Sequence, residues 1–167
     1  MKIKTASLLL VFIILLTGCG IYSFTGASIA PEIKTISIPY FTNQATLVQP
    51  TLAQTLTDAL KDRFMQQTSL SVVNGRGDLH IEGTIINYST QAVAIQADDK
   101  AALNRLNITI KVTFINEFDE KQNFETNFSR YEDYDSKLSL SAVEDNLIKS
   151  ISDALVEDIF NKAVVNW

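Results

Sequence analysis

The single cysteine of this 167-residue chain, Cys19, is the residue whose position indicates chemistry most clearly. Residues 1–7 carry two lysines and no acid, residues 8–16 are uncharged and strongly apolar, and two small residues follow. This order is typical of a secretory signal peptide. The apolar run is shorter than the roughly 20 residues that a membrane-spanning helix needs. The sequence therefore predicts a signal peptide over residues 1–18, cleaved before Cys19.

The four residues at 16–19, Leu-Thr-Gly-Cys, resemble a bacterial lipobox, in which the cysteine thiol receives a diacylglycerol group. We expect Cys19 to carry covalent diacylglycerol and an N-acyl lipid, and we expect no other cofactor. One acyl chain anchors a protein only marginally, at about 0.8 kcal/mol per buried methylene, so two or three chains would hold it firmly. An ordinary signal peptide with an incidental cysteine, or an uncleaved anchor, is the alternative interpretation.

The bulk composition excludes some partners. Removal of residues 1–18 takes two lysines from a chain of net charge −5 and leaves 149 residues of net charge −7. An acidic chain argues against nucleic-acid binding, which needs a basic surface, and against attachment to an anionic membrane by charge alone. The length suits one domain with a sizeable core. We therefore expect a lipidated tether over residues 19–32 and a single domain over residues 33–167.

The remaining sequence offers little for catalysis. Its one histidine, His80, lies between apolar residues in a predicted strand and points to the opposite face, so we interpret it as a solvent-facing structural residue. A zinc site needs several nitrogen or sulfur ligands at set spacing, and none is available. The sequence motifs of serine hydrolases, phosphate-binding loops and zinc proteases are missing. We expect neither enzyme activity nor a metal site, and an envelope hydrolase is the least favoured function.

Charged residues of the strand-rich region are the other candidates. Acidic clusters at 98–99, 117–120 and 132–135 lack the spacing of a calcium-binding loop, and we interpret them as solvated loops. Two or three cations beside an apolar edge could hold an anionic amphiphile through contacts to phosphate. The basic residues of this region are Lys100, Arg105, Lys111, Lys121, Arg130 and Lys137. The sequence does not show that these residues lie close together in the fold. The alternative is that they are ordinary surface residues.

Two segments have the pattern of amphipathic helices. Thr51 with Gln54, and Ser141 with Glu144, each predict a capping box at a helix start. Apolar residues then recur every four positions, which gives each helix one apolar stripe. The stripes are Leu52, Leu56, Leu60 and Phe64 in the first helix, and Leu147, Ile151, Leu155, Ile159 and Ala163 in the second.

Alternating apolar and polar residues predict the strands. The predicted strands are residues 34–41, 69–73, 79–88, 105–115 and 122–131. Between the second and third, Gly75 and Gly77 predict a turn in which both glycines accept positive φ, and Gly83 indicates a bulge. The order of elements predicts an α+β two-layer sandwich, in which both helices pack on one face of a four- to five-stranded, mostly antiparallel sheet.

The N-terminal part of the mature chain carries a family resemblance. Cys-Gly-Ile-Tyr-Ser-Phe at 19–24, Gly-Ala-Ser-Ile at 26–29, Ile-Ser-Ile-Pro-Tyr-Phe at 36–41 and Asn-Gln-Ala at 43–45 resemble the LptE family, in its Bacteroidetes-type branch. The order of a lipidated cysteine, strand, helix, strands and C-terminal helix also fits that family. The resemblance covers essentially the whole mature chain, by identity in this tract and by pattern elsewhere.

The resemblance implies a non-enzymatic outer-membrane lipoprotein of the lipopolysaccharide transport and assembly machine. Members partner and plug the LptD β-barrel and deliver lipopolysaccharide to the outer leaflet, so the domain would lie on the periplasmic side or inside the barrel lumen. In relatives, basic residues at one tip of the domain contact the lipid, and Lys100 and Arg105 are the candidates here by loop position. A free periplasmic lipid-binding or structural lipoprotein is the alternative, and it would need an enclosed apolar pocket.

Overall fold

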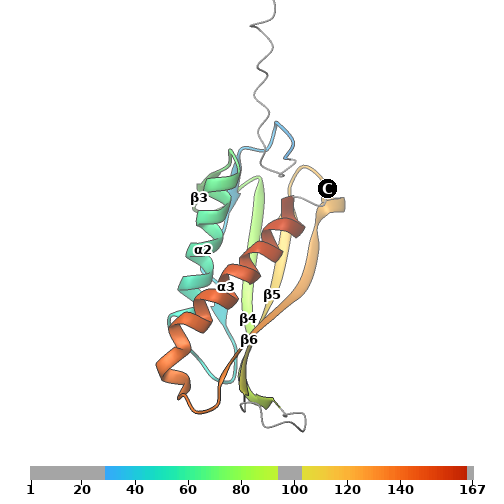
Figure 1. Ribbon diagram of the computed structural model, residues 1–167. Coiled ribbons are helices and arrows are strands. Elements are labelled where there is room, and N and C mark those ends of the chain that lie inside the picture. The colour runs from blue at the N-terminus through green and yellow to red at the C-terminus, as the bar shows by residue number, and fades with distance from the viewer. Residues whose placement is uncertain (1–28, 94–102, 165–167) are drawn as a thin grey trace, which may run out of the picture.

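The chain forms two layers, a sheet and a pair of helices that cover one of its faces (Figure 1). This computed structural model describes residues 29–93 and 103–164. Helix α2 spans Leu52–Gln67 and helix α3 spans Leu140–Val164, and the two helices contact each other. The predicted α+β class is confirmed. Within the described ranges, neither helix is both long enough and apolar enough to cross a membrane.

The sheet has six strands and is mixed, which corrects the expected four to five mostly antiparallel strands. The strands are β1 (Thr35–Ser37), β2 (Thr42–Asn43), β3 (Ser71–Val73), β4 (Leu79–Val93), β5 (Leu103–Asn116) and β6 (Phe124–Asp135), with a 3₁₀ turn η1 (Glu120–Gln122) before β6. The order is β3-β1-β4-β5-β6, and β2 also pairs with β4. β4, β5 and β6 are antiparallel, whereas the short strands β1, β2 and β3 pair in parallel.

Pro39 explains the additional strand. The predicted strand over 34–41 ends at Ser37, and the chain rejoins the edge of β4 only at Thr42. Proline has no backbone N–H to donate to a ladder, so a strand ends near it or lies at an edge. The predicted strand is therefore shortened to β1, and β2 forms in residues expected to be a turn. The two short strands lie one after the other along the same edge of β4.

The core lies between the sheet and the helices. Strand β5 alternates as predicted, and its helix-facing side chains are almost completely buried; they are Leu106, Ile108, Ile110, Val112 and Phe114. Helix α2 contributes the predicted stripe of Leu52, Leu56, Leu60 and Phe64. From α3, Ile151, Leu155 and Ile159 complete the layer.

The helix starts differ from the predicted capping boxes. The Thr51 side chain makes no cap hydrogen bond; instead Gln49 Oε1 accepts the backbone N–H groups of Thr51 and Leu52, at 2.7 and 3.0 Å. Helix α3 begins before Ser141, and Glu144 accepts a hydrogen bond from the Tyr88 hydroxyl of β4. Burial, with that carboxylate beside it, raises the pKa of Tyr88. The cap of α2 therefore comes from a side chain outside the predicted motif, and Glu144 of the other predicted motif bonds to strand β4.

The irregularity of β4 also lies elsewhere than predicted. The register shifts between Ile85 and Asn87, whereas Gly83 pairs regularly with Val112 of β5. A Cβ built on Gly83 would lie 2.4 Å from ring atoms of Phe41. The glycine therefore makes room for the Phe41 ring against the sheet and does not form the bulge.

Candidate functional site

The face of the sheet opposite the helices is polar, and its charges are paired across neighbouring segments. The pairs are Arg76–Glu117, Arg105–Asp133 and Lys111–Glu125, with a hydrogen-bonded row of Asn107, Ser129 and Thr109 between the last two. We call this surface the open face. Cross-strand pairs of this kind stabilise a sheet by about 0.2–1 kcal/mol each. The open face is therefore polar without carrying a large field of one sign.

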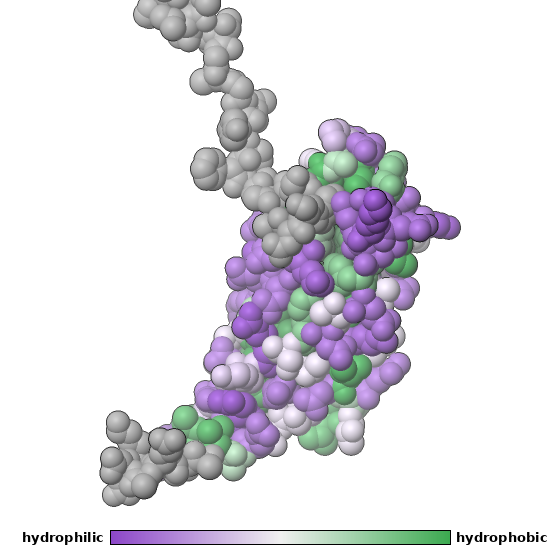
Figure 2. Space-filling view, turned by 90° about the vertical axis from the view of Figure 1, so that its right-hand side faces the viewer, coloured by the Kyte–Doolittle hydropathy of each residue, from purple (hydrophilic) through white to green (hydrophobic). Residues whose placement is uncertain are grey.

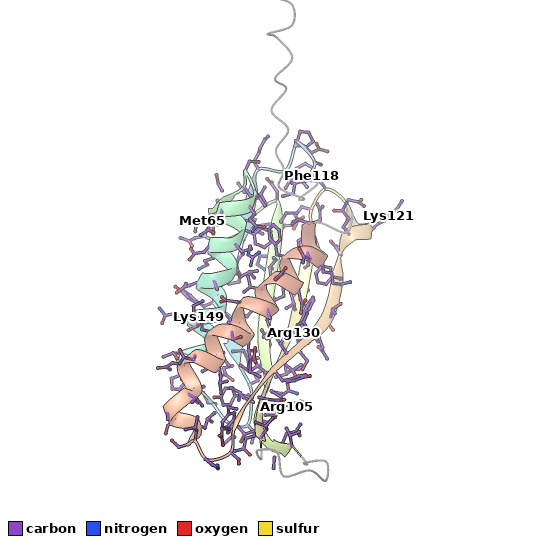
Figure 3. The ribbon with its side chains drawn as sticks, viewed as in Figure 1. Met65, Arg105, Phe118, Lys121, Arg130 and Lys149 are labelled. Carbon is purple, nitrogen blue, oxygen red and sulfur yellow. The ribbon has the colours of Figure 1, made fainter. Side chains whose placement is uncertain are left out.

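Arg105 lies near one end of the open face (Figure 3). It was expected at the start of a strand, beside the loop, and it lies two residues inside β5, which begins at Leu103. Its Nε and Nη2 donate to the two carboxylate oxygens of Asp133 at 2.7 and 2.8 Å, and its Cζ lies 3.7 Å from the centroid of the Tyr131 ring. The guanidinium lowers the pKa of the Asp133 carboxyl. An anionic ligand at Arg105 would have to compete with this carboxylate.

The other candidate site residues do not lie beside Arg105 in the described part of the chain. Cys19 and Lys100 lie outside the described residues. Lys111 pairs with a carboxylate of β6 on the open face, whereas Arg130 donates to Asp158 of α3 at 2.6 Å, on the side of the sheet that the helices cover. Three of the described candidate cations therefore each have their own carboxylate and form no common cluster.

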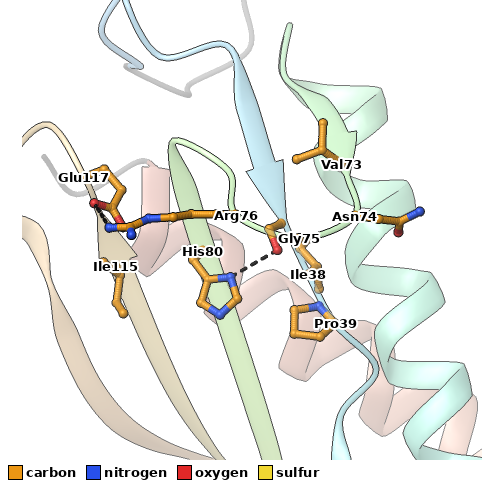
Figure 4. Close-up of a pocket in the computed structure, with 10 residues that line it drawn as sticks. Ile38, Pro39, Val73, Asn74, Gly75, Arg76, His80, Ile115 and Glu117 are labelled. Atoms are coloured by element: carbon orange, nitrogen blue, oxygen red, sulfur yellow. Dashed lines mark hydrogen bonds and ion pairs between the residues drawn. The ribbon is translucent and has the colours of Figure 1, made fainter.

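A hollow of about 590 Å³ opens on the open face where β1, β3 and the start of β4 meet (Figure 4). Apolar side chains from β3, from β5 and from the segment after β1 line much of it, namely Val73, Ile115, Ile38 and Pro39. Ser37 and His80, which pair across β1 and β4, also line it. Ligand-binding clefts commonly measure about 300–1,000 Å³. The hollow therefore has the size of a binding site, although the sequence predicted none here.

The segment between β3 and β4 builds this hollow by crossing β1. β3 and β4 lie on opposite sides of β1 and both run parallel to it, so residues 74–78 must cross that strand. Gly75 has φ +94°, while a Cβ on Gly77 would lie 2.9 Å from Ser37 N and from Leu79 O. The predicted turn is confirmed, but only one glycine has positive φ. The other is required because the loop backbone touches β1.

Asp78 fastens the end of this crossing to the start of β1. Its Oδ2 accepts the backbone N–H groups of Lys34 and Thr35, at 2.8 and 2.9 Å, and its own N–H donates to Thr35 Oγ1 at 2.9 Å. The Lys34 N–H, followed by the two groups of Thr35, lowers the pKa of the Asp78 carboxyl. The crossing is therefore fixed in part by hydrogen bonds that favour the ionised form of the carboxyl.

The polar groups of the hollow are paired with one another. Arg76 donates to both carboxylate oxygens of Glu117 at 2.8–3.1 Å and lowers its pKa. His80 Nδ1 lies 3.1 Å from Ser37 Oγ, and its Nε2 lies 2.9 Å from Glu82 Oε1. The His80 side chain lies on the open face, as predicted, and it is held there between Ser37 and Glu82. Because the charges are balanced, the hollow suits an uncharged apolar group better than an anion.

A second hollow, of about 360 Å³, lies where the tether region enters the domain. Residues 29–33 line it together with Asn116, Phe118 and Gln122. Phe118 is 55% exposed and lies at the end of the domain opposite Arg105 (Figure 3). In the described residues, no group of three or more histidine, cysteine or acidic side chains is placed to hold a metal ion.

Comparison with known proteins gives a family match and a set of similar folds. The model of the LptE family, described as lipopolysaccharide-assembly, matches residues 33–163. A minor lipoprotein from Acinetobacter baumannii is 15% identical, with a TM-score of 0.50 over 78% of this chain and 91% of that one. A protein from Xanthomonas campestris is 12% identical, with a TM-score of 0.53 over 81% and 91%.

A hypothetical protein from Chlamydia trachomatis is 7% identical to this chain, with a TM-score of 0.52 over 80% of this chain and 98% of that one. No curated protein matches the chain significantly. At such low identities, the similarity to solved structures shows a common fold and nothing more specific.

Proposed function

Because the chain belongs to the LptE family of lipopolysaccharide-assembly proteins, we propose that it is an outer-membrane lipoprotein that partners and plugs an LptD-type β-barrel and passes lipopolysaccharide to the outer leaflet. The family match over residues 33–163 carries this proposal. The proposed role is binding and positioning, without an enzymatic step. Acyl chains on Cys19 would attach the domain to the membrane.

The open face supports the plug role. The lumen of a membrane β-barrel is lined by polar side chains. A sheet face on which Arg105, Lys111 and Arg76 each have a carboxylate partner can meet such a wall with these three cations still paired. The same face would be costly to cover with an apolar surface, because its hydroxyl, amide and charged groups would lose water without replacement.

Direct contact with lipopolysaccharide requires a particular charge at the surface of the domain. The domain is acidic and its ligand would be anionic, so contact needs a local cation. Arg105, with Lys100, is the proposed contact. It lies at the end of the domain away from Phe118 (Figure 3), which lines the same hollow as residues 29–33, where the chain enters the domain. A lipid anchor at one end and a ligand contact at the other would place the long axis of the domain along the transport direction.

Co-purification tests the proposed function. The lipidated chain, isolated from detergent-solubilised outer membranes, should bring with it one large β-barrel protein in stoichiometric amount. Cys19→Ser is the matched variant: it should no longer label with palmitate and should appear in the soluble periplasmic fraction. Recovery of the acylated protein without any large barrel would contradict the barrel partnership.

The hollow on the open face suggests a second candidate function, that of a free periplasmic lipid-binding lipoprotein. Its volume of about 590 Å³ and its apolar lining would suit an acyl chain. That function needs an enclosed pocket, however, and the two hollows described above open onto the surface. Lipid that co-purifies with the chain in the absence of a barrel would favour this second function.

A further inference from the structure

Strand β6 is a long and regular edge of the sheet. It spans Phe124–Asp135, and it pairs with β5 on one side only. Its register with β5 is continuous over twelve residue pairs and contains neither a bulge nor a proline. Twelve residues of strand extend over about 40 Å. The opposite edge, β3, is only three residues long, and the part of β4 beyond its pairing with β2, residues 86–93, is shorter and begins at a register shift. β6 is therefore the longest and most regular edge in the described sheet.

The outer backbone groups of β6 have no partner in the described part of the chain. In an antiparallel pair, every second residue of an edge strand directs its N–H and C=O away from its neighbour. Between Glu125 and Tyr134, the described backbone groups bond to β5 and to nothing else. Figure 2, which views the molecule from the side on which β6 lies, shows a mostly hydrophilic surface there. A long uncovered edge is a template for another strand.

On the open face, the charges of β5 and β6 alternate in sign from one strand to the next toward this edge. Strand β5 supplies the cations Arg105 and Lys111, and β6 supplies their partners, Asp133 and Glu125. The outermost row of the face is therefore acidic, with two carboxylates eight residues apart along one strand. A further strand carrying lysine or arginine opposite these two positions would extend the alternation of charge, and opposite charges across strands are stabilising.

We propose that β6 is a pairing edge for an extended segment of another polypeptide that carries basic residues opposite Glu125 and Asp133. This inference rests on the proposed function, within which the segment belongs to the barrel protein and reaches into its lumen. The wall strands of a closed barrel already pair with one another, so the partner is a loop or terminal segment.

A second copy of this chain fits the edge less well. If two β6 strands paired antiparallel about Ser129, Glu125 of each copy would face Asp133 of the other. Each contact would set carboxylate against carboxylate on the same face, twice in one interface. Like charges directly opposite each other across strands are destabilising. The charge pattern therefore favours a basic partner over self-association.

Hydrogen exchange of individual β6 amides in the purified complex tests this proposal. In the isolated lipidated chain, every second amide between residues 125 and 134 should exchange rapidly. In the complex, those amides should exchange at least about 100-fold more slowly, because cross-strand hydrogen bonds now hold them. If the barrel co-purifies but these amides exchange as fast as in the free chain, the edge proposal is wrong and the plug role stands. If no barrel co-purifies, the proposed function itself has failed.

A charge-reversal pair tests the nature of the partner. Glu125→Lys should lower retention of the lipoprotein on the barrel by up to about fivefold at low salt. Asp153→Lys is the matched control, because Asp153 is as exposed as Glu125, pairs with Lys149 at 2.7 Å and lies on the outer side of α3. Equal losses for the two variants would overturn the charge assignment. Protection of β6 amides by self-association, without the barrel, would overturn the choice of partner.

Discussion

The two faces of the sheet are completed in different ways. On one face, α2 and α3 cover Leu106, Ile108 and Ile110 of β5 so fully that none of the three is exposed. On the other, the polar side chains of the same strand pair with β6 and remain at the surface. The buried face therefore provides the stability of the fold, while the open face, with its hollow and its long edge, is free to bind another surface.

The largest expected effect separates the two faces. Leu155→Ala, at a fully buried position of α3, should lower the free energy of unfolding by about 2–5 kcal/mol, because it removes apolar contacts and leaves a cavity. Lys111→Ala on the open face is the comparison and should cost at most about 1 kcal/mol. Urea unfolding of the Cys19→Ser chain measures both. Equal costs would mean that the open face shares in the stability of the core.

The crossing over β1 should show an intermediate effect. Gly77→Ala places a Cβ against backbone atoms of Ser37 and Leu79 and should cost about 1–3 kcal/mol. Gly75→Ala meets no atom within 4 Å, and its cost of about 1–2 kcal/mol comes from the left-handed backbone alone. Urea unfolding together with the amide spectrum of β1 distinguishes them. A larger disturbance of the β1 amides by Gly75→Ala would contradict the packing argument.

Asp78 gives the same region a pH dependence. Its folded-state pKa is lowered by the Lys34 and Thr35 groups, so its contribution to stability is present above the ordinary carboxyl pKa and is lost as the pH falls through the lowered value. Asp78→Asn should therefore be less stable than the parent chain at pH 7, with the gap closing toward pH 2. Unfolding midpoints across that range measure it, and a gap that widens in acid would refute the assignment.

Arg105, like Lys111, should have only a small effect on stability. Arg105→Gln breaks one exposed ion pair with Asp133 and should change the free energy of unfolding by at most about 1 kcal/mol. Its effect on function should be larger, as a reduced yield of lipopolysaccharide photo-crosslinked to the lipoprotein in cells. Arg130→Gln, which loses the pair with Asp158, is the control. If both variants crosslink equally well, Arg105 is not the contact.

Local patterns predicted the elements that bury one face. The four-residue spacing of Leu52, Leu56, Leu60 and Phe64, and the alternation along β5, each require a single periodicity and no knowledge of the neighbours. Both predictions are confirmed, because the burial of those apolar side chains dominates the stability of each element. The same reasoning placed His80 on the open face, where it lies.

Features that depend on distant segments could not be predicted in this way. Nothing near Thr35 indicates parallel pairing of β1 with both β3 and β4, since those partners come from 36 to 45 residues later. The hollow follows from that pairing, and its only local signal was the two glycines in a five-residue connection. Similarly, Gln49 replaced the predicted cap of Thr51 because the preceding loop brings its side chain to the helix start.

The most direct test of the account is a photo-crosslinking residue at Asn127, an exposed open-face position on β6, in living cells. The account predicts that one large outer-membrane β-barrel is the dominant crosslinked protein, and that the crosslinked peptide is an extended lumenal segment rich in lysine or arginine. A crosslinker at Lys149, on the outer side of α3, should give a different peptide. Crosslinks from Asn127 that contain no barrel protein would contradict the assignment of the open face as the partner surface.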